Sequence, residues 1–83
     1  MAPVIVKLYT RKTCKLCDQA KEILLDLQSE VDFKLEEVDI YEDDRLTELY
    51  GIMIPVVEIN GDEVQYGIID RWTIHQALKG RLC

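Results

Sequence analysis

Two cysteines separated by two residues directly follow an apolar run, and this arrangement constrains the fold more than any other feature. The run Val4–Tyr9 is apolar and rich in β-branched residues apart from Lys7, which predicts a buried strand. Cys14 and Cys17 come next, and a pattern of helical period follows them. The cysteines are therefore expected where a strand ends and a helix begins.

The residues after the motif predict a helix from about Cys14 to about Gln28, with Thr13 as its N-cap. Its apolar residues recur at the spacing of one helical face: Leu16, Ala20, Ile23, Leu24 and Leu27. The first N–H groups of a helix lack partners and the helix dipole is positive there, so the motif lies where a thiolate is favoured. Since a thiolate attacks disulfides, we predict Cys14 as the nucleophile and Cys17 as the resolving thiol.

Cysteines at this spacing also occur in zinc sites and structural disulfides, although a position between strand and helix favours redox chemistry. A zinc site would need four ligands, for which the available residues are Cys14, Cys17, His75 and Cys83. His75 is expected on the surface of the last helix. Cys83 is expected to be an exposed thiol without a role, and the alternative is a third redox or metal-binding thiol.

The cysteines lie in the one basic region of an acidic chain, whose net charge is −6. Residues 11–21 contain one acidic residue and four basic ones: Arg11, Lys12, Lys15 and Lys21. Residues 26–48 contain ten acidic and two basic residues, which we interpret as a solvated face. Cations beside a thiol favour its thiolate and attract an anionic thiol or an acidic partner surface, while lysines on a loop can also be merely solvated. The negative total argues against nucleic-acid binding.

The middle of the chain predicts a second strand and a short helix. Apolar residues alternate with charged ones at three positions: Val31, Phe33 and Leu35. Residues 37–40 either continue this half-buried strand or bend away from it. Strand, helix and strand in this order predict parallel strands joined by a right-handed crossover. The short helix is expected over Asp44–Tyr50, with three residues facing inward: Leu46, Leu49 and Tyr50.

An antiparallel hairpin is the clearest prediction for the second half of the chain. Asn60-Gly61 joins Val56–Ile59 to Glu63–Tyr66, and Asn-Gly between two apolar runs is the strongest short signal for a hairpin. Pro55 cannot donate a hydrogen bond to a sheet ladder, so it belongs at a strand start, a bulge or an edge.

Asp70 is the expected N-cap of a last helix that runs from Arg71 to about Lys79. The complete order is β-α-β-α-β-β-α. It predicts an α/β fold in which a four-stranded mixed sheet is flanked by three helices. Eighty-three residues are enough for one small core, so we expect a single domain over residues 1–83.

The cysteine count and the apolar runs indicate a compartment. No apolar run approaches the roughly 20 residues that span a bilayer, and the start shows no basic region followed by an apolar one. Three cysteines is an odd number, whereas a secreted disulfide scaffold more often has a denser, even set. We therefore expect a cytoplasmic protein without a membrane partner.

This order, with Cys14 and Cys17 opening the first helix and Pro55 before the third strand, resembles the thioredoxin fold. Within it, the chain is similar to short bacterial glutaredoxin-like proteins, whose motif has Leu before the second cysteine and an acidic residue and Gln after it. The corresponding residues here are Leu16, Asp18 and Gln19. The resemblance covers nearly the whole chain and implies a thiol–disulfide oxidoreductase.

The resemblance also implies roles for single residues. Cys14 matches the family's nucleophile and Cys17 its resolving cysteine. Pro55 matches a cis-proline that faces the cysteines, which would leave the Ile54 backbone open to a substrate. Asp70 matches an acidic helix start near the amino group of glutathione. The expected substrate-binding residues are the following: Arg11, Lys12, Lys15, Ile54, Pro55 and Asp70.

Three dipeptides depart from the usual glutaredoxin sequence. Glutaredoxins have Pro-Tyr between the cysteines, Thr-Val before the proline and Gly-Gly after the last strand. This chain has Lys15-Leu16, Met53-Ile54 and Tyr66-Gly67. The first change removes an aromatic contact to glutathione, and Tyr66 would crowd its groove.

The sequence therefore predicts thiol–disulfide exchange with a protein disulfide or a low-molecular-weight disulfide. We expect a monomer without a metal or tightly bound cofactor, served by an external reductant that is glutathione or another thiol. Two alternatives remain open. One is a metal or iron–sulfur carrier that binds through Cys14 across a dimer, and the other is a non-catalytic binding module.

Overall fold

The computed structural model describes residues 4–82, with side chains described for residues 4–80. Its elements are β1 Ile5–Thr10, α1 Lys15–Leu27, β2 Lys34–Asp39, the 3-10 turn η1 Ile40–Glu42, α2 Asp44–Tyr50, β3 Val56–Ile59, β4 Asp62–Tyr66 and α3 Arg71–Leu82. The sheet has the order β2-β1-β3-β4. The central strand β1 is parallel to β2 and antiparallel to β3, which is antiparallel to β4. The predicted mixed sheet with three helices is confirmed.

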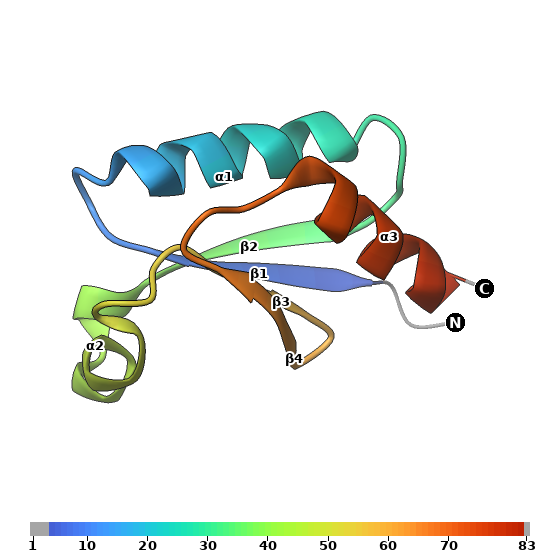
Figure 1. The fold of residues 1–83 in the computed structure, drawn as a ribbon. Coiled ribbons are helices and arrows are strands. Elements are labelled where there is room, and N and C mark those ends of the chain that lie inside the picture. Colours follow the sequence, from blue (N-terminus) through green and yellow to red (C-terminus); the bar gives the residue numbers. More distant parts are fainter. Residues whose placement is uncertain (1–3, 83) are drawn as a thin grey trace.

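Helices α1 and α3 cover one face of the sheet, and α2 lies on the other (Figure 1). Alternate residues of β1 supply the larger core, where Val6 and Leu8 are fully buried. They pack with Leu24 of α1 and with Ile74 and Leu78 of α3, all of which are also fully buried. Removing these side chains from water provides the main force that holds both helices to the sheet.

A smaller core lies beneath the cysteine end of the sheet, on the face that α2 covers. Tyr9, Ile40 and Val56 form it, and Leu46 and Tyr50 of α2 pack against it. Two of the three residues predicted to face inward from α2 therefore do so. The third prediction was wrong: the Leu49 side chain is 62% exposed, because a helix of seven residues has only one narrow face against the sheet.

The predicted hairpin is confirmed at the turn residues. Asn60 and Gly61 both have positive φ, 50° and 89°, which is the type I′ geometry that matches the twist of the flanking strands. Asn60 also joins the turn to the central strand. Its N–H donates to the Ile5 carbonyl and its Oδ1 accepts from the Ile5 N–H, both at 2.9 Å.

The ends of the remaining elements differ slightly from the prediction. β1 runs from Ile5 to Thr10, one residue later than expected, and β2 continues straight to Asp39 rather than bending away. Val31 and Phe33 are buried but precede β2. The last helix continues past Lys79 to Leu82.

Candidate active site

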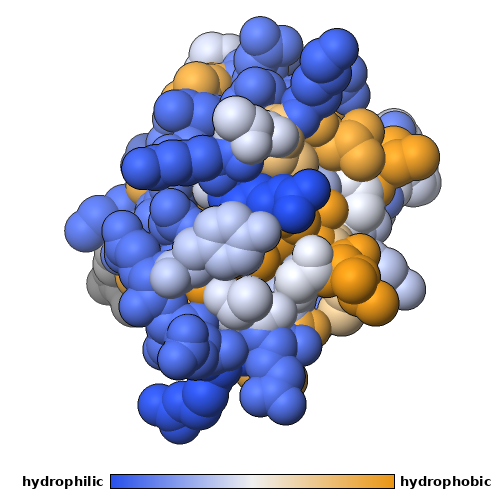
Figure 2. All heavy atoms as spheres, turned by 90° about the vertical axis from the view of Figure 1, so that its left-hand side faces the viewer, coloured by the Kyte–Doolittle hydropathy of each residue, from blue (hydrophilic) through white to orange (hydrophobic). Residues whose placement is uncertain are grey.

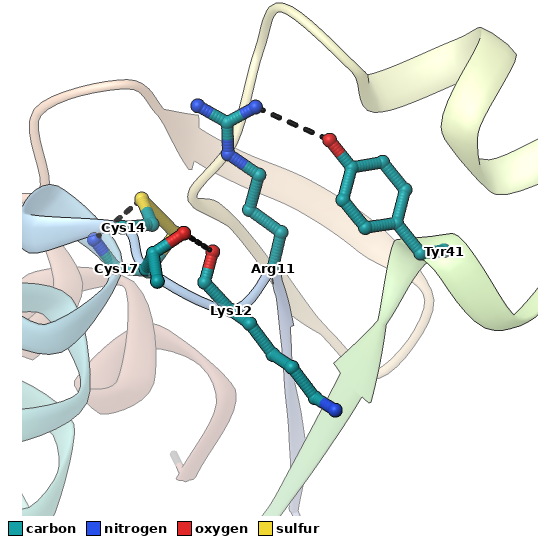
Figure 3. The surroundings of a disulfide bond; sticks show 6 residues. Arg11, Lys12, Cys14, Cys17 and Tyr41 are labelled. Carbon is teal, nitrogen blue, oxygen red and sulfur yellow. Dashed lines mark hydrogen bonds between the residues drawn. A yellow bond between two sulfur atoms is a disulfide. The ribbon is translucent and has the colours of Figure 1, made fainter.

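The first helix begins at the cysteines in a way that corrects the predicted cap. Thr13 has a φ of 54°, so it lies in the left-handed region and is not the N-cap. The N-cap is Cys14, with extended φ and ψ of −123° and 110°. Its sulfur accepts a hydrogen bond from the Cys17 N–H at 3.1 Å (Figure 3). The sulfur therefore takes the place of a capping hydroxyl or carboxylate and satisfies one of the unpaired N–H groups of the first turn.

Cys14 and Cys17 are joined by a disulfide, with their Cα atoms 5.2 Å apart. The two sulfurs have different environments, because Cys14 is half-buried whereas Cys17 is only 3% exposed. A substrate can reach Cys14 from solvent, and Cys17 lies behind it. This asymmetry fits the predicted order, in which Cys14 attacks first and Cys17 resolves.

The burial of Cys17 corrects the predicted apolar stripe of α1. Cys17 faces the sheet together with Ala20, Leu24 and Leu27, at the spacing i, i+3, i+7 and i+10. Leu16, which was assigned to this stripe, is 43% exposed beside the motif. Either residue could begin a helical stripe at this point, and the helix places the sulfur inward.

Three segments meet at the end of the sheet that carries the cysteines. Tyr9 of β1 pairs with Val56 of β3, which pairs with Tyr66 of β4. The motif after β1, Pro55 before β3 and Gly67 after β4 therefore lie at one end of the sheet. The Gly67 N–H donates to the Pro55 carbonyl at 2.8 Å, which joins two of these segments.

The peptide bond between Ile54 and Pro55 is cis, as the resemblance implied. The Ile54 N–H is not open to a substrate, since it donates to the Tyr50 carbonyl at 3.1 Å. Among the residues that the structure describes, none donates to the Ile54 carbonyl. The carbonyl is therefore the group through which the Ile54 backbone could meet a substrate.

The basic residues near the motif do not converge on the sulfurs. The guanidinium of Arg11 donates from Nη1 to the Tyr41 hydroxyl at 3.3 Å, and Figure 3 shows Lys12 extending away from both sulfurs. Lys15 is exposed at the first position of α1. These cations contribute a positive field around the motif rather than direct contacts with sulfur.

Asp70 caps α3. One carboxylate oxygen, Oδ2, accepts from both the N–H and the hydroxyl of Thr73, each at 2.9 Å. The backbone hydrogen bond, followed by the side-chain one, lowers the pKa of Asp70 below its ordinary value. Asp70 is exposed, three residues after Gly67, and its carboxylate is negatively charged at neutral pH.

Tyr9 supports the motif from below. Its ring lies against that of Tyr50, with centroids 4.7 Å apart, and its hydroxyl donates to Glu58 at 3.3 Å. Burial, followed by the negative charge of Glu58, raises the pKa of Tyr9 to about 12. Tyr9 therefore remains a neutral phenol and acts as a structural support.

A polar pocket of about 340 Å³ opens against Cys17 on the β2 side of the motif. Its walls carry Lys21 of α1 and Glu37 of β2, which form an ion pair at 3.0 Å, together with Asp39. Sequence analysis missed this pocket, because it treated the acidic residues as a solvated face. Lys21 follows Cys17 by four residues, so it lies on the same side of the helix, and this spacing was the available signal.

The opposite side of the motif is apolar. Figure 2 views the cysteine end of the molecule and shows hydrophobic side chains gathered mainly at its right and hydrophilic ones over its left and lower parts. Four large apolar side chains are exposed here. They belong to the motif, to the segment before Pro55 and to the segment that runs from β4 into α3: Leu16, Ile52, Ile68 and Trp72. Ile52 is 100% exposed and Ile68 is 76% exposed.

Within the described residues, no three His, Cys, Asp or Glu side chains are grouped so that they could hold a metal ion. Cys83, predicted as an exposed thiol or as a third redox or metal-binding thiol, lies outside those residues. His75 is half-buried on α3. None of the described helices is long and apolar enough to cross a membrane.

A capping Cys-x-x-Cys pair between the first strand and helix of this mixed sheet defines a thioredoxin-fold protein with a redox-type site. The model of the Glutaredoxin-like domain (DUF836) family matches residues 5–79. The chain belongs to this family, which confirms the resemblance.

Similarity to a curated protein and to solved structures supports this assignment. A thioredoxin of Methanocaldococcus jannaschii is 29% identical over 85 residues, covering 99% of this chain and 100% of the relative. The solution structure of a Nitrosomonas europaea protein matches with a TM-score of 0.81 and 31% identity, covering 94% of each chain. The X-ray structure of an X. campestris protein matches with a TM-score of 0.77 and 28% identity, covering 90% of this chain and 96% of the other.

Proposed function

We propose that the protein is a thiol–disulfide oxidoreductase that works by dithiol exchange. The Cys14 thiolate attacks a substrate disulfide and forms a mixed disulfide, and Cys17 then attacks Cys14 and displaces the reduced substrate. One observation carries this proposal: the accessible Cys14 sulfur accepts the Cys17 N–H at the helix start and is joined by a disulfide to the buried Cys17. The same hydrogen bond and the helix dipole stabilise a thiolate at Cys14.

An external thiol restores the dithiol by reducing the Cys14–Cys17 disulfide. The reaction needs no metal or tightly bound cofactor, because both electrons pass through sulfur. It suits a reducing compartment such as the cytoplasm. Glutathione or another thiol is the reductant that we propose.

The reduction potential of the Cys14–Cys17 pair tests this function. We expect a two-electron couple between about −270 and about −180 mV, the span between thioredoxin and protein disulfide isomerase. Equilibration with a thiol–disulfide buffer followed by mass spectrometry measures it. If no two-electron oxidation of this pair occurred at accessible potentials, dithiol exchange would be excluded, and a purified protein with a coloured cluster would then indicate a carrier.

We further propose that the substrate is a protein disulfide. Leu16, Ile52, Ile68 and Trp72 are exposed around the motif and can bury apolar side chains of a polypeptide. Covering such a side chain contributes about 1.5–3 kcal/mol. The basic residues Arg11 and Lys12, on the other side of the motif, attract acidic side chains of the same partner.

Replacing Ile68 by aspartate should weaken the reduction of a protein disulfide and spare that of a small one. For Ile68→Asp we expect kcat/KM toward insulin to fall about tenfold, because the substitution removes about 1.4 kcal/mol of apolar contact. The reaction of Cys14 with a small aromatic disulfide should change less than about twofold.

Leu25→Asp is the matched control, because Leu25 is a 48% exposed leucine on α1, two turns beyond Cys17. It introduces the same charge away from the motif and should leave the reduction of insulin unchanged. Equal losses in both variants, or an Ile68→Asp loss that is the same for both substrates, would contradict docking through Ile68.

A further inference from the structure

Thr13, the residue before the motif, has a backbone conformation that its own side chain disfavours. Its φ of 54° lies in the left-handed region, where a β-branched side chain crowds the backbone. Among the described residues, the other non-glycine residue with positive φ is Asn60, whose short amide side chain tolerates that region. Thr13 is exposed, so core packing does not force this conformation on it. Such a cost persists only where the neighbouring structure imposes it.

The start of α1 imposes the conformation, because two adjacent residues compete to cap this helix. If Thr13 were the cap, its hydroxyl would accept the Leu16 N–H and its carbonyl would accept the Cys17 N–H. In the structure, the Cys17 N–H donates instead to the Cys14 sulfur at 3.1 Å (Figure 3). The Thr13 hydroxyl points backwards and donates to the Lys12 carbonyl at 2.6 Å. The two starts exclude each other, because each uses the same N–H of Cys17.

The state of the Cys14 sulfur decides which start has the lower free energy. In the disulfide, the covalent bond to Cys17 keeps the sulfur beside the N–H of that residue. A free thiolate keeps it there by charge, because a hydrogen bond to an ionised acceptor is roughly twice as strong as a neutral one. A neutral thiol is only a weak acceptor. In that state the helix start can return to Thr13, with its backbone in the extended region typical of a cap.

We propose that Thr13 is a positioning residue for Cys14. It leaves the cap to the sulfur in the disulfide and in the thiolate, and it takes the cap back when Cys14 is a neutral thiol. This inference rests on the proposed dithiol exchange and names what controls its nucleophile. Since deprotonation of Cys14 also has to move the helix start, the competing cap holds part of the reduced protein in a form that does not attack disulfides.

The rate at which limiting iodoacetamide alkylates Cys14 in the reduced protein, measured from about pH 4 to about pH 9, tests the proposal. For Thr13→Gly we expect the midpoint of this profile to fall by about half a pH unit, so that alkylation below the midpoint is about threefold faster. Glycine accepts a positive φ without cost and has no hydroxyl with which to cap. The plateau above the midpoint should not change, whereas the loss of a merely supporting side chain would not make the thiol more reactive at low pH.

Thr13→Ser and Thr13→Ala are the matched pair, because they differ only in the hydroxyl. Serine can still cap the helix, so its midpoint should stay within about 0.2 units of that of the unsubstituted protein, while alanine should move part of the way to glycine. The charged groups around the motif are the same in all four proteins, so a shift reports the cap. These groups come from the loop, α1, β2, η1 and the segment after β4: Arg11, Lys12, Lys15, Asp18, Lys21, Glu37, Asp39, Glu42 and Asp70.

Backbone chemical shifts of Thr13 in the reduced protein report its conformation directly. We expect a left-handed residue above the Cys14 midpoint and an extended one below it, with the Cys17 amide proton moving at the same pH. A Thr13 that stays left-handed at low pH would overturn the proposal. Equal midpoints in Thr13→Gly and the unsubstituted protein, or equal shifts in the serine and alanine variants, would do the same.

Failure of the proposed function would look different from failure of this inference. If the protein did not perform dithiol exchange, the Cys14–Cys17 pair would show no two-electron potential in a thiol–disulfide buffer. Alkylation of Cys14 does not depend on that exchange, because it consumes a single thiolate. The two measurements therefore separate an incorrect function from an incorrect assignment of Thr13.

Discussion

Replacing Cys14 by serine should reduce disulfide turnover to the uncatalysed rate. A serine hydroxyl is not ionised by a helix start at neutral pH, so no nucleophile reaches the substrate disulfide. Cys17 cannot substitute for it, because its side chain is 3% exposed behind Cys14. Reduction of insulin by the variant, with an external thiol as the electron source, measures the loss.

Cys17→Ser should behave differently from Cys14→Ser. It retains the attack by Cys14 but has no resolving thiol, so one equivalent of substrate should remain bound to the protein as a mixed disulfide that mass spectrometry detects. Cys83→Ser removes the third thiol of the chain and serves as the control, with turnover unchanged. Labelling of Cys17 before Cys14 by a limiting alkylating reagent would reverse the two roles.

The sequence was sufficient to predict the architecture because the signals for it are local. Asn60-Gly61 specifies a type I′ turn through the positive φ of both residues, and this turn pairs β3 with β4. A strand, a helix and a second strand in this order predict that the two strands are parallel and that the helix crosses between them. Such signals depend only on residues that are neighbours in the sequence, so they can be recognised without a structure.

Two predictions failed at the start of α1, where the sequence allowed two starts and two rotations of the helix. Thr13 has the commoner side chain for an N-cap, but the cap is Cys14, whose sulfur reaches the Cys17 N–H at 3.1 Å. The rotation of the helix about its axis also differs from the prediction, since Cys17 is buried and Leu16 is 43% exposed. Propensity cannot decide between these alternatives, since the packing against the sheet decides them.

The pocket beside Cys17 could not be predicted because its walls come from distant segments. Lys21 and Glu37 meet only when β2 lies beside β1, which places the end of β2 under the first turns of α1. In the sequence, Glu37 is one of many acidic residues. The register of the parallel pair makes it the partner of Lys21.

Leu24→Ala should destabilise the fold by about 3 kcal/mol, because it leaves a cavity between α1 and the sheet. Leu24 is fully buried in the larger core. A domain of this length has a total stability of about 4–12 kcal/mol, so the variant loses a large share of it. Urea unfolding followed by circular dichroism measures the change as a lower midpoint with an unchanged slope.

Leu25→Ala is the matched control for this change, because the next residue of the same helix is 48% exposed. It should cost less than about 0.5 kcal/mol. The Leu24 variant should also expose the resolving thiol more often, since Cys17 belongs to the same buried stripe of α1. If Cys17 reacts only when the fold opens, 3 kcal/mol corresponds to alkylation about a hundredfold faster in the reduced protein. Equal destabilisation by both substitutions would show that the stripe does not hold α1 to the sheet, whereas destabilisation without faster alkylation would show that Cys17 reacts without opening.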